Sequence, residues 1–234
     1  TAKKMALVFT GDEFGDDGKA IATALQQHNA KASFFLTGRF YRNPQFKSII
    51  KHLGQQGHYL GAHSDEHLLY NDWTVRDSLL VSKEQFWTDL HNNYNELQKW
   101  GIGKKDARYF LPPFEWYNDT IAAWTREAGL QLVNYTPGTL SHADYTTPDA
   151  RNYRSSETIY NSIINFEKTS RNGLNGAILL LHIGTDKKRT DKFYHKLPQL
   201  LTYLKRNGYD LMRVDDLLRK PTNININIGG TPPQ

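Results

Sequence analysis

The chain has 234 residues, 38% of them hydrophobic, which is enough to bury one sizeable core in a single domain. Its formal charge of +5 comes from scattered basic residues, which do not form the concentrated basic stripe of a nucleic-acid-binding protein. No apolar run reaches the length of a membrane span, and the absence of cysteine excludes disulfides, thiol catalysis and thiolate metal ligands.

Short β-rich runs alternate with longer amphipathic stretches along the first part of the chain. Strands are predicted at 5–9, 32–36, 59–62, 108–111 and 130–133, and helices at 18–28, 44–56, 81–100 and 118–128. A stretch rich in Thr, Ser and Pro at 136–156 is predicted to be a long loop, a class of segment that is often functional.

The alternation then resumes with a helix at 157–168, a strand at 177–181, a helix at 193–207 and a strand at 209–214. Repeated strand–helix units imply parallel strands covered by helices. The fold class is therefore α/β, either a barrel or an open sheet.

The composition changes at residue 221. The alternation of Ile224, Ile226 and Ile228 is compatible with an edge strand, whereas the Gly-Gly and Pro-Pro pairs that follow favour a linker. We expect one domain at 1–220 and a linker-like tail at 221–234, leading to a further module.

Two acids follow the first predicted strand. Asp12 and Glu13 are adjacent carboxylates that repel each other, so a nearby cation would stabilise them. In α/β barrels, acids at the C-terminal ends of strands line the active face. An acidic turn or helix cap is the alternative interpretation.

Two histidines follow the third predicted strand. His63 and His67 are four residues apart, and on a helical turn their imidazoles would share a face and could meet one metal ion. With nine histidines in the chain, such a spacing also arises by chance. The position directly after a strand strengthens the functional interpretation.

Two further strand ends carry distinctive residues. Pro112 and Pro113 close the fourth strand and fix the backbone ahead of Phe114, which either aims amide groups into a cleft or makes a plain rigid turn. His182 ends an apolar strand, where a single histidine is more often a core residue than a catalyst.

The order of these four signals resembles that of the NodB-type polysaccharide deacetylases, carbohydrate esterase family 4, over nearly the whole chain. Thr10-Gly11-Asp12-Glu13 is similar to the family motif Thr-Phe-Asp-Asp, and His63-Ser64 with His67 matches the motif His-Ser/Thr-x-x-His. Pro112-Pro113-Phe114-Glu115 with Asn118 is similar to the turn Pro-Pro-Tyr-Gly with its downstream Asn. Leu180 with His182 matches the late motif Leu-x-His. The resemblance implies a single distorted (β/α) barrel of the NodB deacetylase type. It also implies metal-dependent hydrolysis of N- or O-acetyl groups from a polysaccharide.

The resemblance also implies a role for each matched residue. Glu13, His63 and His67 would bind a divalent metal ion, with zinc favoured and cobalt or nickel as alternatives. Asp12 would be the general base and His182 the general acid.

Other matched positions would contact the substrate. The backbone N–H of Phe114 would stabilise the oxyanion, Pro113 would hold that turn, and Leu180 would line the pocket for the acetyl methyl group. Trp116 would put a bulky ring beside the cleft. The family's Asp-Trp motif has two candidates, Asp144-Tyr145 and Asn134-Tyr135, so Tyr135 is a further candidate for the cleft.

Two positions depart from the family pattern. Glu13 is one methylene longer than the usual Asp, and Leu111 stands where an Arg usually pairs with the base. Arg108 is a doubtful replacement, because on an ideal strand it points to the other face. We therefore expect Asp12 to lack its usual cationic partner.

Two alternative functions stay open at this point. One is a metal-free glycosidase that uses paired carboxylates such as Glu13 and Glu115. The other is a non-catalytic carbohydrate-binding module on a decayed deacetylase scaffold. For the deacetylase we expect a monomer, which is the default for a single domain. We also expect it to act outside the cytoplasm, which follows from its polymeric substrate alone.

Overall fold

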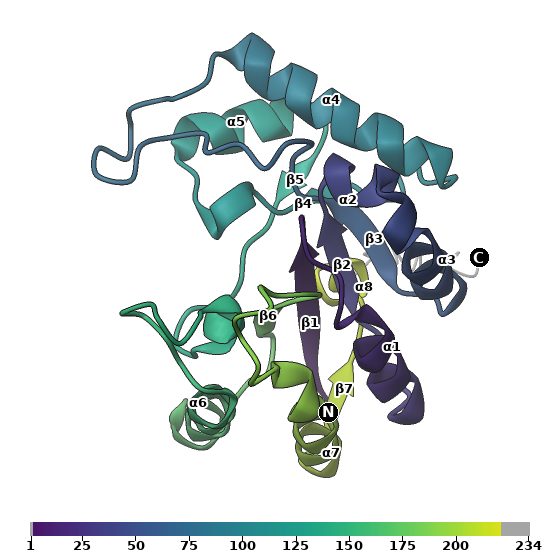
Figure 1. Ribbon diagram of the computed structural model, residues 1–234, viewed down its shortest axis with the longest axis vertical. Helices are drawn as coiled ribbons and strands as arrows, with labels where there is room; N and C mark the ends of the chain where they lie inside the picture. Colours follow the sequence, from purple (N-terminus) through teal and green to yellow (C-terminus); the bar gives the residue numbers. More distant parts are fainter. Residues whose placement is uncertain (1, 221–234) are drawn as a thin grey trace, which may run out of the picture.

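The structure is a computed structural model that describes residues 2–220 (Figure 1). The expected tail at 221–234, with its possible edge strand, lies outside the described residues. Within the described range, none of the helices combines the length and the apolar character needed to cross a membrane.

The core of the molecule is a seven-stranded sheet in which each pairing is parallel. The strand order is β5-β4-β3-β2-β1-β6, and β7 pairs with the first residues of β1. The strands are β1 (Lys3–Gly11), β2 (Ser33–Leu36), β3 (Tyr59–Ala62), β4 (Tyr109–Phe110), β5 (Gln131–Leu132), β6 (Ile178–His182) and β7 (Tyr209–Leu211).

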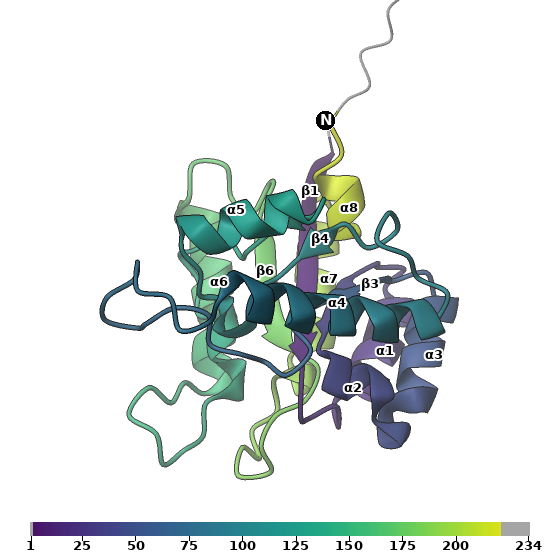
Figure 2. The same ribbon diagram turned by 90° about the horizontal axis from the view of Figure 1, so that it is seen from above.

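Helices surround these strands, as Figures 1 and 2 show. They are α1 (Gly18–Gln27), α2 (Gly38–Arg42), α3 (Lys47–Gln55), α4 (Lys83–Lys99), α5 (Asp119–Glu127), α6 (Ser156–Thr169), α7 (Leu197–Arg206) and α8 (Val214–Leu217). Short 3-10 turns lie at Pro44–Phe46, Pro113–Glu115, Ser141–Tyr145 and Phe193–His195.

The predicted alternation is confirmed, with three local corrections. The predicted helices at 44–56 and 193–207 each begin with a 3-10 turn before the α-helix starts. The predicted strand at 209–214 is too long, because Val214 donates its N–H to the Ser33 hydroxyl and starts α8. Helix α2 was not predicted; its five residues are too few for a periodic pattern, although the Thr37 hydroxyl caps it by accepting from the Phe40 N–H.

The sheet curls until its two edges meet. Beyond β5, the Thr136 N–H donates to the Ile178 carbonyl at 2.9 Å, and the Ile178 N–H donates to the Thr136 hydroxyl at 3.0 Å. These two hydrogen bonds join the β5 side to β6 without a regular ladder. The predicted distorted (β/α) barrel is therefore confirmed.

Hydrophobic side chains cover both faces of the central strands. Met5–Phe9 in β1 and Phe34–Leu36 in β2 are almost completely buried. Such continuous apolar runs are typical of parallel strands that are covered on both faces. Because the strands are parallel, their C-terminal ends share one rim, where the polar segments singled out in the sequence gather.

Candidate active site

The carboxylate of Asp12 lies just beyond the end of β1 and is held by two side chains. The Thr37 hydroxyl donates to its Oδ1 at 2.9 Å, and Arg39 donates from Nε to Oδ1 at 3.1 Å and from Nη2 to Oδ2 at 2.6 Å. The expectation that Asp12 lacks a cationic partner is therefore wrong. Leu111 is fully buried, and the guanidinium comes instead from Arg39 on helix α2, which follows β2.

The rings of His63 and His67 meet after the end of β3, with centroids 5.1 Å apart. The segment that carries them is a loop and not the helical turn that the spacing suggested, and Ser64 and His67 have φ of 73° and 55°. The expected proximity is found, but its predicted cause is wrong. Left-handed backbone at two non-glycine residues needs support from the surrounding structure.

Helix α4 supplies much of that support. The buried carboxylate of Asp89 accepts hydrogen bonds from the Ser64 hydroxyl at 2.7 Å and from the backbone N–H groups of Asp65 and Glu66, both at 3.1 Å. Asn93 accepts the His63 N–H at 2.9 Å. Burial raises the pKa of Asp89, although these donors oppose the shift. The sequence had not singled out Asp89 or Asn93, because nothing in a helix interior marks a residue as a loop anchor.

Helix α2 holds the same loop from the other side. The backbone N–H groups of Gly38 and Arg39 donate to the carbonyls of Ser64 and Asp65 at 3.1 and 3.2 Å. The Asp65 carboxylate packs so closely on Gly38 that a Cβ there would collide with it. The residue that orients Asp12 and the loop that carries the histidines are therefore parts of one packed unit.

Both imidazoles of the pair are suited to donate a lone pair. Nδ1 of His63 lies 2.7 Å from the Leu111 carbonyl, which can only accept, so Nδ1 carries the proton and Nε2 is free. Burial lowers the pKa of His63 well below 6.5 and that of His67 to about 4. Both rings are therefore neutral at neutral pH, the form that binds metal ions.

Glu115 is the carboxylate nearest to this pair. Its Oε1 lies 3.9 Å from Nε2 of His63, and burial raises its pKa to about 7. The backbone reaches this position through left-handed residues, with φ of 60° at Phe114 and 53° at Glu115. The Asn134 side chain fixes the turn by donating to the Glu115 carbonyl at 2.9 Å. The sequence named Glu115 as one carboxylate of an alternative glycosidase but did not indicate its approach to His63.

The histidine pair offers two of the donors that a metal ion needs. Two neutral imidazoles with centroids 5.1 Å apart are a suitable pair of donors for a divalent ion. Within residues 2–220, however, no three His, Asp or Glu side chains are grouped to hold one ion. Glu13 is an exposed residue beside Arg39, and its role as the third ligand stays a prediction.

His182 ends β6 and forms a pair with Asp144. Oδ1 of Asp144 lies 2.6 Å from Nδ1 of His182, and Oδ2 accepts the His182 backbone N–H at 2.8 Å. Burial alone would lower the pKa of His182, but the Asp144 carboxylate outweighs it and the pKa is raised. His182, which stands alone at a strand end in the sequence, is therefore paired with a carboxylate, and this pairing favours its protonated form.

Asp144 also belongs to one of the two candidates for the Asp-Trp motif. Asp144 lies in the 3-10 turn Ser141–Tyr145, and the ring of Tyr145 lies 5.1 Å from that of His182. Tyr135 instead stacks on His142 at 4.8 Å. The structure favours Asp144-Tyr145 as the counterpart of that motif.

The remaining substrate candidates take different positions. Pro113 is buried in the turn, while the Phe114 ring is 42% exposed and lies 4.4 Å from the His67 ring. Trp116 is half-buried and donates from Nε1 to the Asp72 carbonyl at 3.2 Å. Leu180 is fully buried, two residues before His182 and therefore on the same face of β6.

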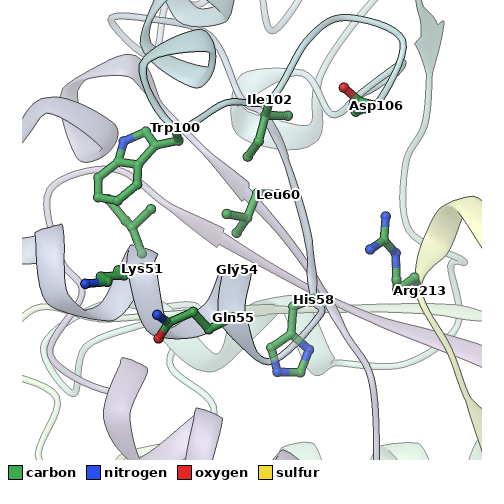
Figure 3. A pocket seen from close by; sticks show the side chains of 10 residues that line it. Lys51, Gly54, Gln55, His58, Leu60, Trp100, Ile102, Asp106 and Arg213 are labelled. Carbon is green, nitrogen blue, oxygen red and sulfur yellow. The ribbon is translucent and has the colours of Figure 1, made fainter.

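An open pocket lies away from this site, at the N-terminal end of β3. Figure 3 shows its lining, in which Trp100, His58 and Arg213 surround a cavity of about 440 Å³. The Nδ1 atom of His58 accepts the Ala32 N–H at 3.1 Å. In α/β barrels this end of the strands usually serves stability, so cavity volume does not locate the chemistry here.

The curled parallel sheet, with paired acids and histidines at the C-terminal ends of its strands, defines an α/β-barrel enzyme. Residues 2–133 match the family described as polysaccharide deacetylase. The chain belongs to that family, which confirms the resemblance and the predicted enzyme class, a polysaccharide deacetylase.

Two relatives are similar along most of the chain. Peptidoglycan-N-acetylglucosamine deacetylase from Bacillus cereus is 29% identical over 197 residues, covering 83% of this chain and 78% of that protein. Peptidoglycan-N-acetylmuramic acid deacetylase from Bacillus subtilis is 26% identical over 220 residues, covering 92% of this chain and 72% of that protein.

Solved structures share the fold. The Xyl-CE4 domain of a multidomain xylanase from the hindgut metagenome of Trinervitermes trinervoides has a TM-score of 0.69 at 22% identity, covering 93% of this chain and 90% of that one. A family 4 acetyl xylan esterase from Clostridium thermocellum, in complex with a cobalt ion, has a TM-score of 0.70 at 22% identity, covering 92% and 90%. A family pseudoenzyme from Bacillus anthracis has a TM-score of 0.70 at 18% identity, covering 94% and 66%.

Proposed function

We propose that this chain is a metal-dependent hydrolase that removes N- or O-acetyl groups from a polysaccharide outside the cytoplasm. The observation that carries the proposal is the pair of His63 and His67, whose ring centroids lie 5.1 Å apart. This pair lies near the Asp12 carboxylate, which Arg39 holds, and near His182, which Asp144 holds. Metal ligand, base and acid are three separate roles, and the rim offers a suitable group for each.

His63 and His67 would hold the ion, with zinc favoured and cobalt or nickel as alternatives. When bound, the ion polarises the acetyl carbonyl and lowers the pKa of the attacking water. The third ligand is a carboxylate, for which Glu13 is favoured by its motif and Glu115 by its 3.9 Å approach to His63. A related esterase in complex with cobalt supports the choice of a divalent ion.

Asp12 acts as the general base. Thr37 and Arg39 hold its carboxylate in one orientation, and both oxygens keep lone-pair capacity to accept the proton of the attacking water.

His182 acts as the general acid. Its raised pKa keeps the proton that the leaving amine or alkoxide needs, and the fixed Asp144 carboxylate orients the ring. The reaction then leaves acetate and a free amine or hydroxyl on the sugar.

The substrate contacts follow from the same assignment. The Phe114 N–H would stabilise the oxyanion, a contribution of ~3 kcal/mol for one well-placed donor. Pro113 would hold that turn, Leu180 would line the methyl pocket, and Trp116 and Tyr135 would border the cleft. We further propose a monomer that works beside another carbohydrate-active module.

The test is release of acetate from chitin oligomers, peptidoglycan and acetylated xylan by protein loaded with zinc or cobalt. We expect release that stops on chelation and returns when the ion is restored. Glu13→Gln and Glu115→Gln show which of the two carboxylates is the third ligand, since only substitution of the true ligand should weaken metal binding in calorimetry. Activity that survives chelation would favour a metal-free glycosidase instead.

A non-catalytic carbohydrate-binding role is the second candidate, because one protein of this fold is described as a pseudoenzyme. Its main support in the sequence was the missing Arg at position 111. Arg39 removes that support by pairing with Asp12. Glycan binding without metal binding would select this candidate.

A further inference from the structure

Three aromatic rings form a ridge that leads away from the histidine pair. The ridge consists of Trp73, Phe114 and Trp116, with Trp73 centred 5.5 Å from Phe114 and 5.6 Å from Trp116. Its inner end is the Phe114 ring, 4.4 Å from His67. The ridge is therefore continuous with the candidate active site.

The outer part of the ridge is strongly exposed. Trp73 keeps 55% of its surface in contact with solvent, and Phe114 keeps 42%. Trp116 is held from one side by the Arg76 guanidinium, which lies 4.4 Å from its ring centre. Exposed aromatic patches of this kind mark binding sites, because leaving them in water is unfavourable.

The loop that carries Trp73 is held in a fixed shape by its own hydrogen bonds. Oδ1 of Asp72 accepts the backbone N–H groups of Thr74 at 2.8 Å and Val75 at 2.7 Å. An isolated antiparallel bridge joins Asn71 to Leu79 across the loop. Trp73 is therefore exposed at the tip of an ordered segment.

The same loop is fastened to the turn that carries the other two rings. Trp116 donates to the Asp72 carbonyl at 3.2 Å, and Arg76 donates from Nε to the Tyr117 carbonyl at 2.9 Å. Asn118 in turn donates to the Arg76 carbonyl at 3.1 Å. The three rings therefore belong to one preorganised surface, which limits the entropy lost on binding.

We propose that the ridge binds a sugar unit next to the acetylated unit of the same glycan chain. A pyranose offers an apolar C–H face to an aromatic ring and hydroxyl groups at its edge, which suits rings with polar neighbours such as Arg76 and Asp72. The direction of the chain towards His67 rests on the proposed function, whereas binding itself requires no turnover. The proposal makes Trp73 a determinant of chain-length preference.

The test compares Trp73→Ala with Trp87→Ala, which removes a 40% exposed tryptophan from α4, outside the ridge. The probes are N-acetylglucosamine and acetylated xylose series from one sugar to the hexamer, in calorimetry and in acetate release. Trp73→Ala should weaken hexamer binding about 10-fold, the equivalent of one lost stacking contact. Trp73→Ala should leave single-sugar turnover unchanged, and Trp87→Ala should leave hexamer binding unchanged. The melting temperature should not change in either variant. Trp73→Phe should restore most of the hexamer binding.

The outcomes separate this proposal from the proposed function. Equal affinity of the unmodified protein for one sugar and for the hexamer in both series would overturn the ridge and leave hydrolysis standing. Equal losses in Trp73→Ala and Trp87→Ala would also overturn it. Length-dependent binding that needs Trp73 but releases no acetate would support the ridge and overturn the hydrolase.

Discussion

Two buried histidines lie at opposite ends of one four-residue strand. His58 directly precedes β3 and His63 directly follows it. Burial lowers the pKa of both, to about 4 for His58, so both rings are neutral at neutral pH. Residue type, burial and charge state therefore do not distinguish them.

What separates the two histidines is the direction of one hydrogen bond. Nδ1 of His58 accepts the Ala32 N–H, so its free lone pair is used inside the fold. Nδ1 of His63 donates to the Leu111 carbonyl, so its lone pair at Nε2 points to the side of His67 and Glu115. The backbone group opposite Nδ1 thus decides which histidine is structural and which can bind a ligand.

The largest expected effect comes from exchanging each histidine for alanine. His63→Ala should lower zinc affinity at least ~100-fold and reduce acetate release to background, because it removes a direct donor. His58→Ala should keep activity but lower the free energy of unfolding by about 1–3 kcal/mol, since the buried Ala32 N–H loses its acceptor. Calorimetry with zinc and urea unfolding measure the two effects.

The two alanine variants, His63→Ala and His58→Ala, control for each other. Each variant is the reference for the other, because both remove one buried imidazole from an end of β3. If His58→Ala lost metal binding as completely as His63→Ala while remaining folded, the distinction between the two ends would be wrong.

The sequence was sufficient to predict the fold. Strand–helix alternation and the apolar runs at 5–9 and 177–181 are local signals, and β1 and β6 bear them out. The short helix α2 was missed because five residues are too few for a periodic pattern, and the end of β7 was missed because the residue that follows the strand contacts a distant residue. Val214, the first residue of α8, donates its N–H to the Ser33 hydroxyl, 181 residues away in the chain.

The site was predictable as a set of strand ends but not as a set of contacts. Motif order pointed to Asp12, His63, His67 and His182, which the structure places at or just beyond the C-terminal ends of β1, β3 and β6. Arg39, which holds Asp12, comes from a segment that carries no signal of its own, whereas Asp144 was already one of two motif candidates, without an indication that it would pair with His182. Such pairings are defined by tertiary packing, so one sequence cannot reveal them.

The second prediction concerns Asp144, which makes His182 unlike His58. Asp144→Asn should reduce kcat by about 10²–10⁴-fold, the usual contribution of a general acid. Asp144 raises the pKa of His182, and the acid works only when protonated, so activity falls as pH rises through that pKa. Losing the carboxylate lowers the pKa and should move the alkaline limb of the kcat profile to lower pH.

Asp149→Asn is the matched control, because Asp149 is an exposed aspartate in the same long loop. It should leave both rate and pH profile unchanged. An Asp144→Asn enzyme with a reduced rate but an unmoved alkaline limb would show that Asp144 holds the loop and does not control the acid.

The third prediction tests whether α2 replaces the cation missing at position 111. Arg39→Met should lower kcat about 10-fold with little change in KM, because Asp12 loses two charge-assisted hydrogen bonds that orient it. The kcat of Arg39→Lys should lie between those of the unmodified protein and Arg39→Met, since an ammonium cannot reproduce the bidentate geometry. Full activity in Arg39→Met would mean that Thr37 alone orients the base.

The smallest effect is expected at the N-terminal end of β3, in the pocket of Figure 3. Arg213 pairs with Asp215 at 2.9 Å and lies over the Tyr59 ring, but it keeps 31% of its side-chain surface exposed. Solvent screening limits such a pair to ~1 kcal/mol or less, so Arg213→Met should shift the urea midpoint only slightly and leave kcat/KM unchanged. A 10-fold loss of kcat/KM would instead couple this end of the barrel to the chemistry, and His58 could then no longer be assigned to stability alone.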